Sequence, residues 1–270
     1  MDNGIDNQAI FSTIFFRAGL PIIIAWLLLF LAYFIALIDS TREPFADLGS
    51  KDSHILYLLS QSGGTTGTTI IAVLMLALLL IYGRVTSKRQ ILTIGIMILI
   101  VAGCIGGGAF LNEFIIKEQL KVPRPNIITL AGENGSGPLG MTPEEVYGSG
   151  GKVVRSKLLA EVLNSESNPV SLIPSIKTHW IKETGYSFPS GHSFASMSIA
   201  TFFLFLSATY LSMSRLWPFY FLLPWAVAVC YSRSILRVHT PTDIVVGGFI
   251  GLMVGLIAWI VTRKMTRRRT

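Results

Sequence analysis

Long apolar runs separated by short polar segments dominate the chain. A helix that crosses a bilayer needs about 20 mostly apolar residues. Six stretches meet or approach that length, at about residues 16–38, 66–82, 91–116, 193–213, 216–232 and 243–261. Lipid offers no partner for unpaired strand edges, so each stretch is expected to be a helix. The pattern predicts an all-α integral membrane protein with six transmembrane helices and a single domain over residues 1–270.

Composition and charge agree with this assignment. Hydrophobic residues make up 51% of the chain and charged residues only 14%, whereas soluble domains carry about 25% charged residues. The net charge of +7 could indicate nucleic acid. The basic residues, however, gather in short clusters beside apolar spans, at residues 84–89 and 263–269. Such clusters set membrane orientation. The chain has no basic stripe interleaved with aromatic residues, which disfavours nucleic-acid binding.

The loop charges predict how the chain lies across the membrane. The basic 83–90 loop and the basic tail are expected on the cytoplasmic side, which places both termini there. The segments 122–187 and 233–242 then lie on the opposite side. The 122–187 segment is polar and rich in glycine, contains a predicted helix near residues 153–164, and is expected to form a small cap.

Two sets of glycines within the apolar stretches are expected to form helix-packing surfaces: Gly106, Gly107 and Gly108, and Gly247, Gly251 and Gly255.

One group of candidate residues leaves the third predicted helix as Lys117–x6–Arg124–Pro125. Lys117 lies one turn beyond Glu113, so an i,i+4 ion pair is one interpretation. Extension of the Lys117 ammonium to the membrane interface is another. A functional role for Lys117 is the third, and this motif alone does not choose among them.

A second group, Pro189–Ser190–Gly191–His192, directly precedes the fourth apolar span. A helix that starts there presents free backbone N–H groups and its positive dipole end, and Gly191 lets an anion approach the backbone closely. Ordinary N-capping by Ser190 is the structural alternative. His192 favours the anion site, because capping needs no imidazole.

A third group, Ser232–Arg233–x5–His239–x3–Asp243, spans the connection between the last two predicted helices. Thr240 and Pro241 are typical of an N-cap and first helical position. Asp243 would lie in the first turn, where it could reach His239 and fix its tautomer. Stabilisation of the helix N-terminus by Asp243 is the alternative.

The three groups together indicate a phosphate site. They bring three cations, two of the chain's four histidines and one aspartate to the same predicted side of the membrane. Charges this close to apolar helices cost free energy unless they are paired or bound. A phosphate would satisfy all three cations at once. The two cysteines, Cys104 and Cys230, lie inside apolar stretches, and their spacing predicts neither a disulfide nor a metal site.

These motifs, in this order, resemble those of the type 2 phosphatidic acid phosphatase family. The stretch from His179 to Pro189 resembles more narrowly the bacterial phosphatidylglycerophosphate phosphatase B branch. The resemblance covers the chain from about the third helix to the sixth. It implies a multi-pass lipid phosphatase of the bacterial inner membrane, with its site on the periplasmic face and a lipid phosphate as its partner. It implies no obligate protein partner.

The resemblance also implies a role for each residue. His239 would attack phosphorus and become a phosphohistidine, with Asp243 orienting it. His192 would protonate the leaving oxygen. The non-bridging oxygens would be held by five residues: Lys117, Arg124, Ser190, Gly191 and Arg233. The resemblance requires no metal or other cofactor.

Several alternatives stay open at this point. The same phosphohistidine could transfer its phosphate to another lipid rather than to water, and a lipid A phosphatase would use the same site. Soluble vanadate-binding haloperoxidases share a similar motif set, but six apolar spans disfavour them. A transporter would carry its ionisable residues near the bilayer midplane, unlike this chain. The motifs contact only the phosphate, so phosphatidylglycerophosphate, phosphatidate, undecaprenyl pyrophosphate and lysophosphatidate are all admissible substrates.

Overall fold

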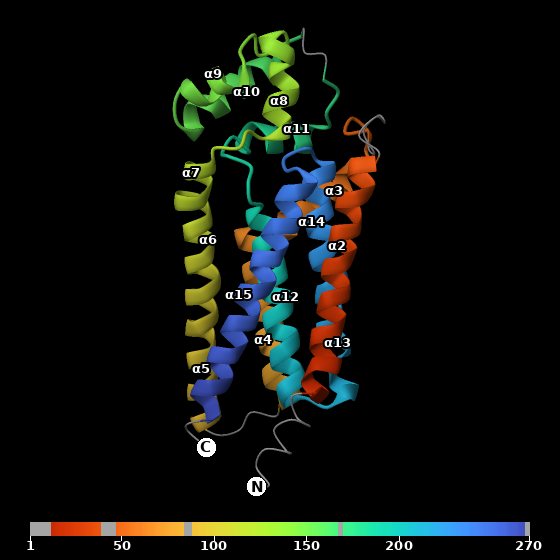
Figure 1. Cartoon of the computed structure of the whole chain (residues 1–270), viewed down its shortest axis with the longest axis vertical. Helices are drawn as coiled ribbons and strands as arrows, with labels where there is room; N and C mark the ends of the chain where they lie inside the picture. The colour runs from red at the N-terminus through yellow and green to blue at the C-terminus, as the bar shows by residue number, and fades with distance from the viewer. Residues whose placement is uncertain (1–11, 39–46, 84–87, 167–169, 268–270) are drawn as a thin grey trace.

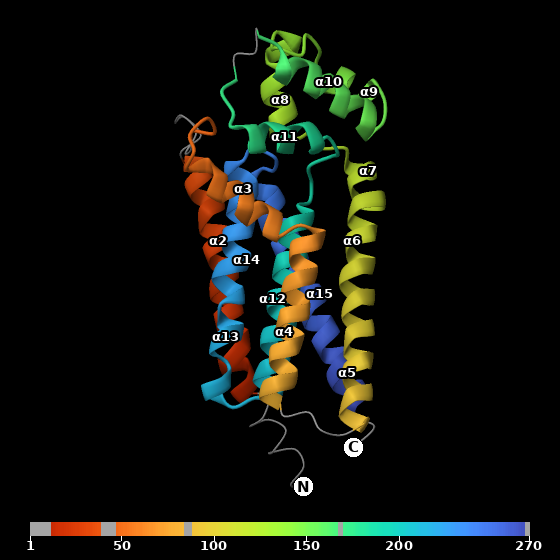
Figure 2. The ribbon, with the colours of Figure 1, turned by 180° about the vertical axis from the view of Figure 1, so that it is seen from behind.

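The structure, a computed structural model, describes residues 12–38, 47–83, 88–166 and 170–267. These residues form helices and connecting segments, without a strand among them. Long helices stand side by side along the long axis of the molecule (Figure 1). The short helices α8 to α11 gather at one end, and the described chain begins and ends at the other (Figures 1 and 2). The all-α prediction is confirmed.

Five described helices are long and apolar enough to cross a membrane: Ser12–Leu31, Thr65–Gly83, Gly95–Ala131, Gly191–Tyr210 and Pro241–Met265. They correspond to five of the six predicted spans. The predicted span 216–232 is instead divided into α13 (Trp217–Tyr220) and α14 (Leu222–Ile235). Pro224 lacks the N–H group that would bond the Tyr220 carbonyl oxygen in a continuous helix, and α14 alone is shorter than the other spans. The sixth span is therefore not confirmed, although α14 packs beside α2 (Leu20–Ile38) and α12 (Gly191–Tyr210) in the bundle.

The third helix runs over residues 88–120 and combines α-helical and π-helical turns. Its pieces are α5 (Lys88–Val101), η2 (Ala102–Gly106), α6 (Gly107–Leu111), η3 (Asn112–Ile116) and α7 (Lys117–Leu120). A π turn inserts extra backbone into a helix, and such turns often lie at functional sites. Here the second π turn directly precedes Lys117. Lys121 then adopts a left-handed conformation (φ 49°) and ends the helix.

The core of the bundle is the contact between α12 and α15 (Pro241–Arg267). A Cβ atom on Gly247, Gly251 or Gly255 would lie 2.3–2.5 Å from a backbone oxygen of Ser190, Phe194 or Ser198. The two backbones can approach so closely only because these three positions carry no side chain. The predicted packing role of these glycines is confirmed.

The same prediction was wrong for two glycines of the third helix. A Cβ on Gly106 or Gly107 would meet no atom within 4 Å, and only Gly108 faces a neighbour, the ring of Phe194. The third helix lies beside the bundle rather than inside it (Figures 1 and 2), so its small residues border open space.

The segment 122–187 forms a small layer with its own apolar core. It contains α8 (Pro125–Ala131), η4 (Glu133–Gly135), α9 (Pro143–Gly148), α10 (Lys152–Asn164) and α11 (Pro174–Lys182). Leu130, Leu159 and Trp180 are fully buried there, and α3 (Ser53–Ser62), which lies in a predicted loop, packs against α11. The helix predicted near residues 153–164 is confirmed by α10.

Candidate active site

The start of α15 holds the predicted histidine–aspartate pair. Thr240 Oγ1 accepts a hydrogen bond from the Asp243 N–H (3.2 Å), and the Thr240 N–H donates to Asp243 Oδ2 (2.8 Å). This reciprocal capping fixes the carboxylate in the first helical turn. His239 Nδ1 lies 3.3 Å from Asp243 Oδ2, and the imidazole is buried. The prediction that Asp243 reaches back to His239 is confirmed.

Ser187 is a neighbour of this pair that the motif reasoning did not name. Its hydroxyl donates to Asp243 Oδ2 and lies 3.3 Å from His239 Nδ1. The Ser190 N–H donates to the Asp243 carbonyl oxygen (3.0 Å). The carboxylate therefore accepts bonds from several donors, and the segment that carries Ser187 and Ser190 is attached to the start of α15.

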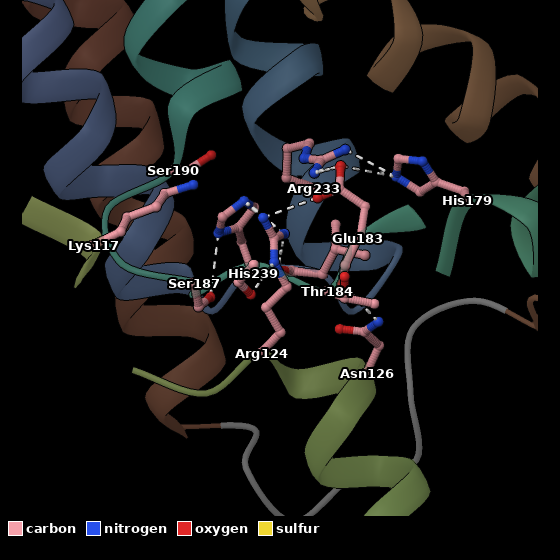
Figure 3. A network of polar contacts seen from close by, with 12 residues as sticks. Lys117, Arg124, Asn126, His179, Glu183, Thr184, Ser187, Ser190, Arg233 and His239 are labelled. Atoms are coloured by element: carbon pink, nitrogen blue, oxygen red, sulfur yellow. Dashed lines mark hydrogen bonds and ion pairs between the residues drawn. The ribbon is translucent and has the colours of Figure 1, made fainter. Parts of the chain in front are cut away.

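Arg124 lies against the other side of His239. Its Nε donates to the carbonyl oxygen of Gly185 (2.9 Å), and its Nη1 donates to that of Val238 (3.0 Å). Nη1 is also 3.2 Å from His239 Nε2. Arg124 is 4% exposed, and these bonds hold its guanidinium beside the imidazole (Figure 3).

Arg233, on α14, is fully buried in the same place. Its Nη1 donates to Ser60 Oγ (2.6 Å) and lies 2.9 Å from His179 Nε2. Its Nη2 contacts Glu183 Oε1 at 2.5 Å. Among the described residues, its buried Nε finds no acceptor. Arg233 is not one of the residues that line the cavity beside His192 and His239.

Glu183 is the main residue that the sequence reasoning missed. Its Oε2 lies 2.9 Å from Arg124 Nη2, while Oε1 contacts Arg233, so one carboxylate joins two of the predicted phosphate-binding cations (Figure 3). Burial alone would raise the pKa of Glu183, but Arg124 and Arg233 hold it well below its ordinary value. Glu183 is thus an anion, placed where the motifs predict a phosphate.

Lys117, the third predicted cation, is 4% exposed and makes the ion pair that its spacing suggested. Its Nζ lies 2.8 Å from Glu113 Oε2. The other oxygen of Glu113 contacts Lys152 on α10, so the ion pair continues into the cap segment. In Figure 3 the Lys117 side chain points toward Ser190. The structural interpretation of Lys117 is therefore correct, and the functional one is compatible with it.

The N-terminus of α12 shows the capping that was the structural alternative for the second motif. Ser190 is the N-cap, and its Oγ accepts from the N–H of Ser193. Gly191 and His192 begin the helix and line a cavity together with His239. A Cβ on Gly64 would lie 3.4 Å from His192 Nε2, so that glycine leaves room beside the imidazole.

Two side chains of the cap segment, Tyr147 and Arg155, hold the loop near its end that carries Glu183 and Ser187. The Tyr147 hydroxyl accepts from the Arg124 N–H (3.1 Å) and donates to the Gly185 carbonyl oxygen (3.1 Å). Arg155 donates to the Thr184 carbonyl oxygen (2.8 Å) and lies over the Tyr147 ring. The Tyr147 ring in turn stacks on Tyr186. The cap thereby fixes the backbone around the predicted phosphate site.

A cavity of about 700 Å³ connects this polar end with the apolar part of the bundle. Its polar end contains Lys117, Arg124, Glu183, His192 and His239. Its long walls are apolar and come from α4 (Thr65–Gly83), the third helix and α12. The shape is suited to a molecule with an anionic head and an apolar tail.

The protonation state of His239 suits a nucleophile. Burial, together with the charges of Arg124 and Arg233, lowers the pKa of His239 well below its ordinary value. The imidazole is then neutral near pH 7. With Nδ1 as the nitrogen that faces Asp243, the lone pair lies on Nε2.

No group of three His, Cys, Asp or Glu side chains within the described ranges is placed to hold a metal ion.

Comparison with known proteins agrees with the motifs. The chain is 32% identical to phosphatidylglycerophosphatase B of Escherichia coli (strain K12) over 156 residues, which are 55% of this chain and 54% of that protein. It is 27% identical to phosphatidylglycerophosphatase B of Haemophilus influenzae over 220 residues, 80% of this chain and 84% of that protein. It is 32% identical to the lipid A 4'-phosphatase of Bacteroides thetaiotaomicron over 84 residues, 31% of this chain and 35% of that protein.

The alignment with the E. coli protein thus spans about half of its length. A family model extends the similarity across the spans that carry the site. The model of the PAP2 superfamily matches residues 91–267, more than half of the chain, and includes all three motifs. The predicted family is confirmed: this chain belongs to the PAP2 superfamily.

Proposed function

We propose that the protein is a membrane phosphatase that removes a terminal phosphate from a lipid through a phosphohistidine intermediate. The observation that carries the proposal is the arrangement of His239 between Asp243 and Arg124 at the polar end of an otherwise apolar cavity. The phosphatase relatives support the reaction class. Phosphatidylglycerophosphate is the favoured substrate, and phosphatidate and undecaprenyl pyrophosphate are further candidates.

The proposed first step forms a P–N bond and breaks a P–O ester bond. Nε2 of His239 attacks phosphorus, and Asp243 stabilises the positive charge that develops on the imidazole. The leaving lipid oxygen takes a proton from His192, a contribution of about 10²- to 10⁴-fold. In the second step water attacks the phosphohistidine and gives its proton to His192. Inorganic phosphate leaves, and both histidines return to their starting state.

The cations would hold the three non-bridging oxygens as charge moves between them. Arg124 and Arg233 approach from the same side as Glu183, and Lys117 approaches from the third helix. The unpartnered Nε of Arg233 supports this assignment, because a buried donor without an acceptor is costly. The N–H groups at the start of α12 would complete the anion site. Glu183 competes with the phosphate for both arginines, so substrate binding requires the carboxylate to release them.

The cavity supports a lipid substrate over a soluble phosphate ester. Its apolar walls accept hydrocarbon, and the exposed apolar side chains of the third helix, such as Phe110 and Phe114, would face lipid. The proposed orientation keeps the termini cytoplasmic and the site periplasmic. Reporter fusions at positions 86 and 150 test it, because they should report opposite sides. The same side at both positions would refute the topology.

Phosphate release by the purified protein in detergent micelles tests the reaction. Phosphatidylglycerophosphate, phosphatidate, lysophosphatidate and undecaprenyl pyrophosphate form the panel, with His239→Gln as the matched variant. We expect His239→Gln to be inactive, chelators to have no effect and vanadate to inhibit. Protein quenched in alkaline detergent, where a phosphohistidine is stable, should carry label from a ³²P-lipid only when His239 is present. Full activity in His239→Gln, or a strict requirement for Mg²⁺, would refute the proposal.

Transfer to a second lipid is the alternative outcome of the same assay. Added lipid A or phospholipid would then carry the label while free phosphate stays low. The fate of the phosphate depends on whether water or an acceptor lipid reaches the phosphohistidine.

A further inference from the structure

Asn112, on the cavity side of the third helix, has a polar atom that the proposed reaction does not use. Its side chain is 5% exposed and lies in the π turn η3. Nδ2 donates a long hydrogen bond of 3.4 Å to the Pro189 carbonyl oxygen. Oδ1 is buried and receives no hydrogen bond from any described residue. A buried carbonyl oxygen without a donor costs free energy, so a ligand that supplies the donor would recover that cost.

The position of Asn112 in the cavity indicates which part of a lipid it would meet. Of the described residues with such an unpartnered atom, Asn112 is the one that lines the cavity. On the N-terminal side of Asn112, the residues of the third helix that line the cavity are apolar or glycine, as at Ile105, Gly106 and Ala109. On its C-terminal side the charged residues Glu113 and Lys117 line the cavity. Asn112 therefore marks the boundary between the apolar wall and the charged end.

The spacing along the helix gives the scale of that boundary. Lys117 is five positions after Asn112, which corresponds to roughly 7 Å of helix axis. This is the scale of a short headgroup between a phosphate and an apolar tail. Nδ2 of Asn112 also lies 3.7 Å from where a Cβ on Gly191 would be, beside His192. The leaving oxygen of the lipid, which takes its proton from His192, would therefore pass close to Asn112.

We propose that Asn112 Oδ1 accepts a hydrogen bond from a hydroxyl on the lipid, two carbons from the phosphate ester oxygen, and that it selects substrates that carry this hydroxyl. Phosphatidylglycerophosphate and lysophosphatidate carry it, whereas phosphatidate and prenyl phosphates do not. The inference rests on the proposed phosphatase function and adds the substrate class. A site built around a hydroxyl rejects the analogue that lacks it, because the polar group of the protein is then left unpaired.

A pair of substrates that differ only in this hydroxyl tests the assignment. We would measure kcat/KM for lysophosphatidate and for its 2-deoxy analogue, in the wild type and in Asn112→Leu, which keeps the size but removes the amide. The wild type should prefer lysophosphatidate by about tenfold or more, and Asn112→Leu should reduce that ratio to about one. Thr69→Val is the matched control, because Thr69 also lines the cavity but its hydroxyl already donates to the Thr65 carbonyl oxygen.

The readout is a ratio within one preparation, so a lower folded fraction in Asn112→Leu does not affect it. An unchanged preference in Asn112→Leu, or no preference in the wild type, would overturn the assignment of Asn112 while leaving the phosphatase function intact. A preference that disappears equally in Thr69→Val would also overturn it. Failure of the wild type to release phosphate from either lipid would instead refute the proposed function.

Discussion

Two helices that both contribute to the site, α12 and the third helix, are held in different ways. In the apolar span of α12 83% of the residues are buried, whereas in the span that contains the third helix only 11% are. Three glycines bring α15 against the backbone of α12, while Gly106 on the third helix borders open space. The difference separates two tasks. In the proposed reaction the packed helices would fix the reacting groups to each other, and the third helix would provide a wall that a lipid can approach.

The largest expected effect comes from a cation on the packed side. Arg233→Met leaves the buried carboxylate of Glu183 with Arg124 as its remaining arginine partner. Breaking a buried pair in this way costs about 3–5 kcal/mol of stability. Because Arg233 is also proposed to bind phosphate, activity should fall by at least about a hundredfold. Thermal unfolding in detergent and phosphate release measure the two effects, and Lys157→Met, an exposed cation on α10, should change neither. An Arg233→Met variant that keeps its activity and stability would contradict the proposed difference between the packed helices and the third helix.

Two matched glycine substitutions test the packing difference itself. Gly251→Leu would drive a side chain into the backbone of α12, where a Cβ already lies 2.3 Å from the Phe194 oxygen. Overpacking costs about 1–3 kcal/mol and occasionally more, so the unfolding temperature should fall. Gly106→Leu should leave it unchanged, because nothing lies within 4 Å. This second variant narrows the cavity, so it should raise KM for long-chain lipids but not for a short-chain phosphate ester. Equal loss of stability in both variants would contradict the comparison.

Lys117 sharpens the comparison because it is a cation on the loosely packed side. Glu113 keeps its contact with Lys152 when Lys117 is removed, so Lys117→Met should leave the unfolding temperature nearly unchanged. A hydrogen bond to a charged group contributes about 1.5–3 kcal/mol, so kcat/KM should fall by roughly tenfold to a hundredfold. A marked loss of stability in Lys117→Met would show that the Glu113–Lys117 pair is structural instead.

The smallest effect concerns pH. Burial, and next the charge of Arg233, lowers the pKa of His179 from 6.5 to about 4. Between these values the unfolded chain takes up a proton that the folded protein does not, so stability falls as pH drops from 6.5 towards 4. His179→Gln should remove this contribution, on the order of 1–3 kcal/mol. Unfolding temperatures measured across that range should then depend less on pH. The same pH dependence in the wild type and His179→Gln would contradict the shift.

The sequence was sufficient for the parts of the site that local spacing determines. Asp243 reaches His239 because both lie at the start of one helix, and Ser190 caps α12 because its position before the apolar run requires it. Five spans could be predicted from length and hydropathy. The division at Phe221 was missed because the apolar pattern continues across it, although Pro224 was a signal in the sequence for a break in the helix. The π turns were also missed, since they leave no periodic signal over so few residues.

Glu183 could not be placed because it acts across the fold. It meets Arg124 and Arg233 through the loop between α11 and α12, and no spacing along the chain links the three. A signal was nevertheless present. Buried cations near apolar helices need anionic partners, and Glu183 is the one acidic residue close to the Pro189–Ser190–Gly191–His192 motif before that helix. The open space beside Gly106 could not be predicted either, because small residues on a helix occur both at tight helix–helix contacts and along cavities.

The Tyr147 hydroxyl has a consequence for how molecules enter and leave. It joins the backbone of Arg124 to that of Gly185, and Arg155 holds the next residue of the same loop. If the cap segment moved away from the bundle, it would therefore carry Arg124 and Glu183 away from His239 and Arg233. A lipid of the proposed function would then enter along the third helix, where the cavity wall is apolar. Hydrogen exchange at Arg124, whose N–H donates to the Tyr147 hydroxyl, should accordingly be slow in both the free and the lipid-bound protein.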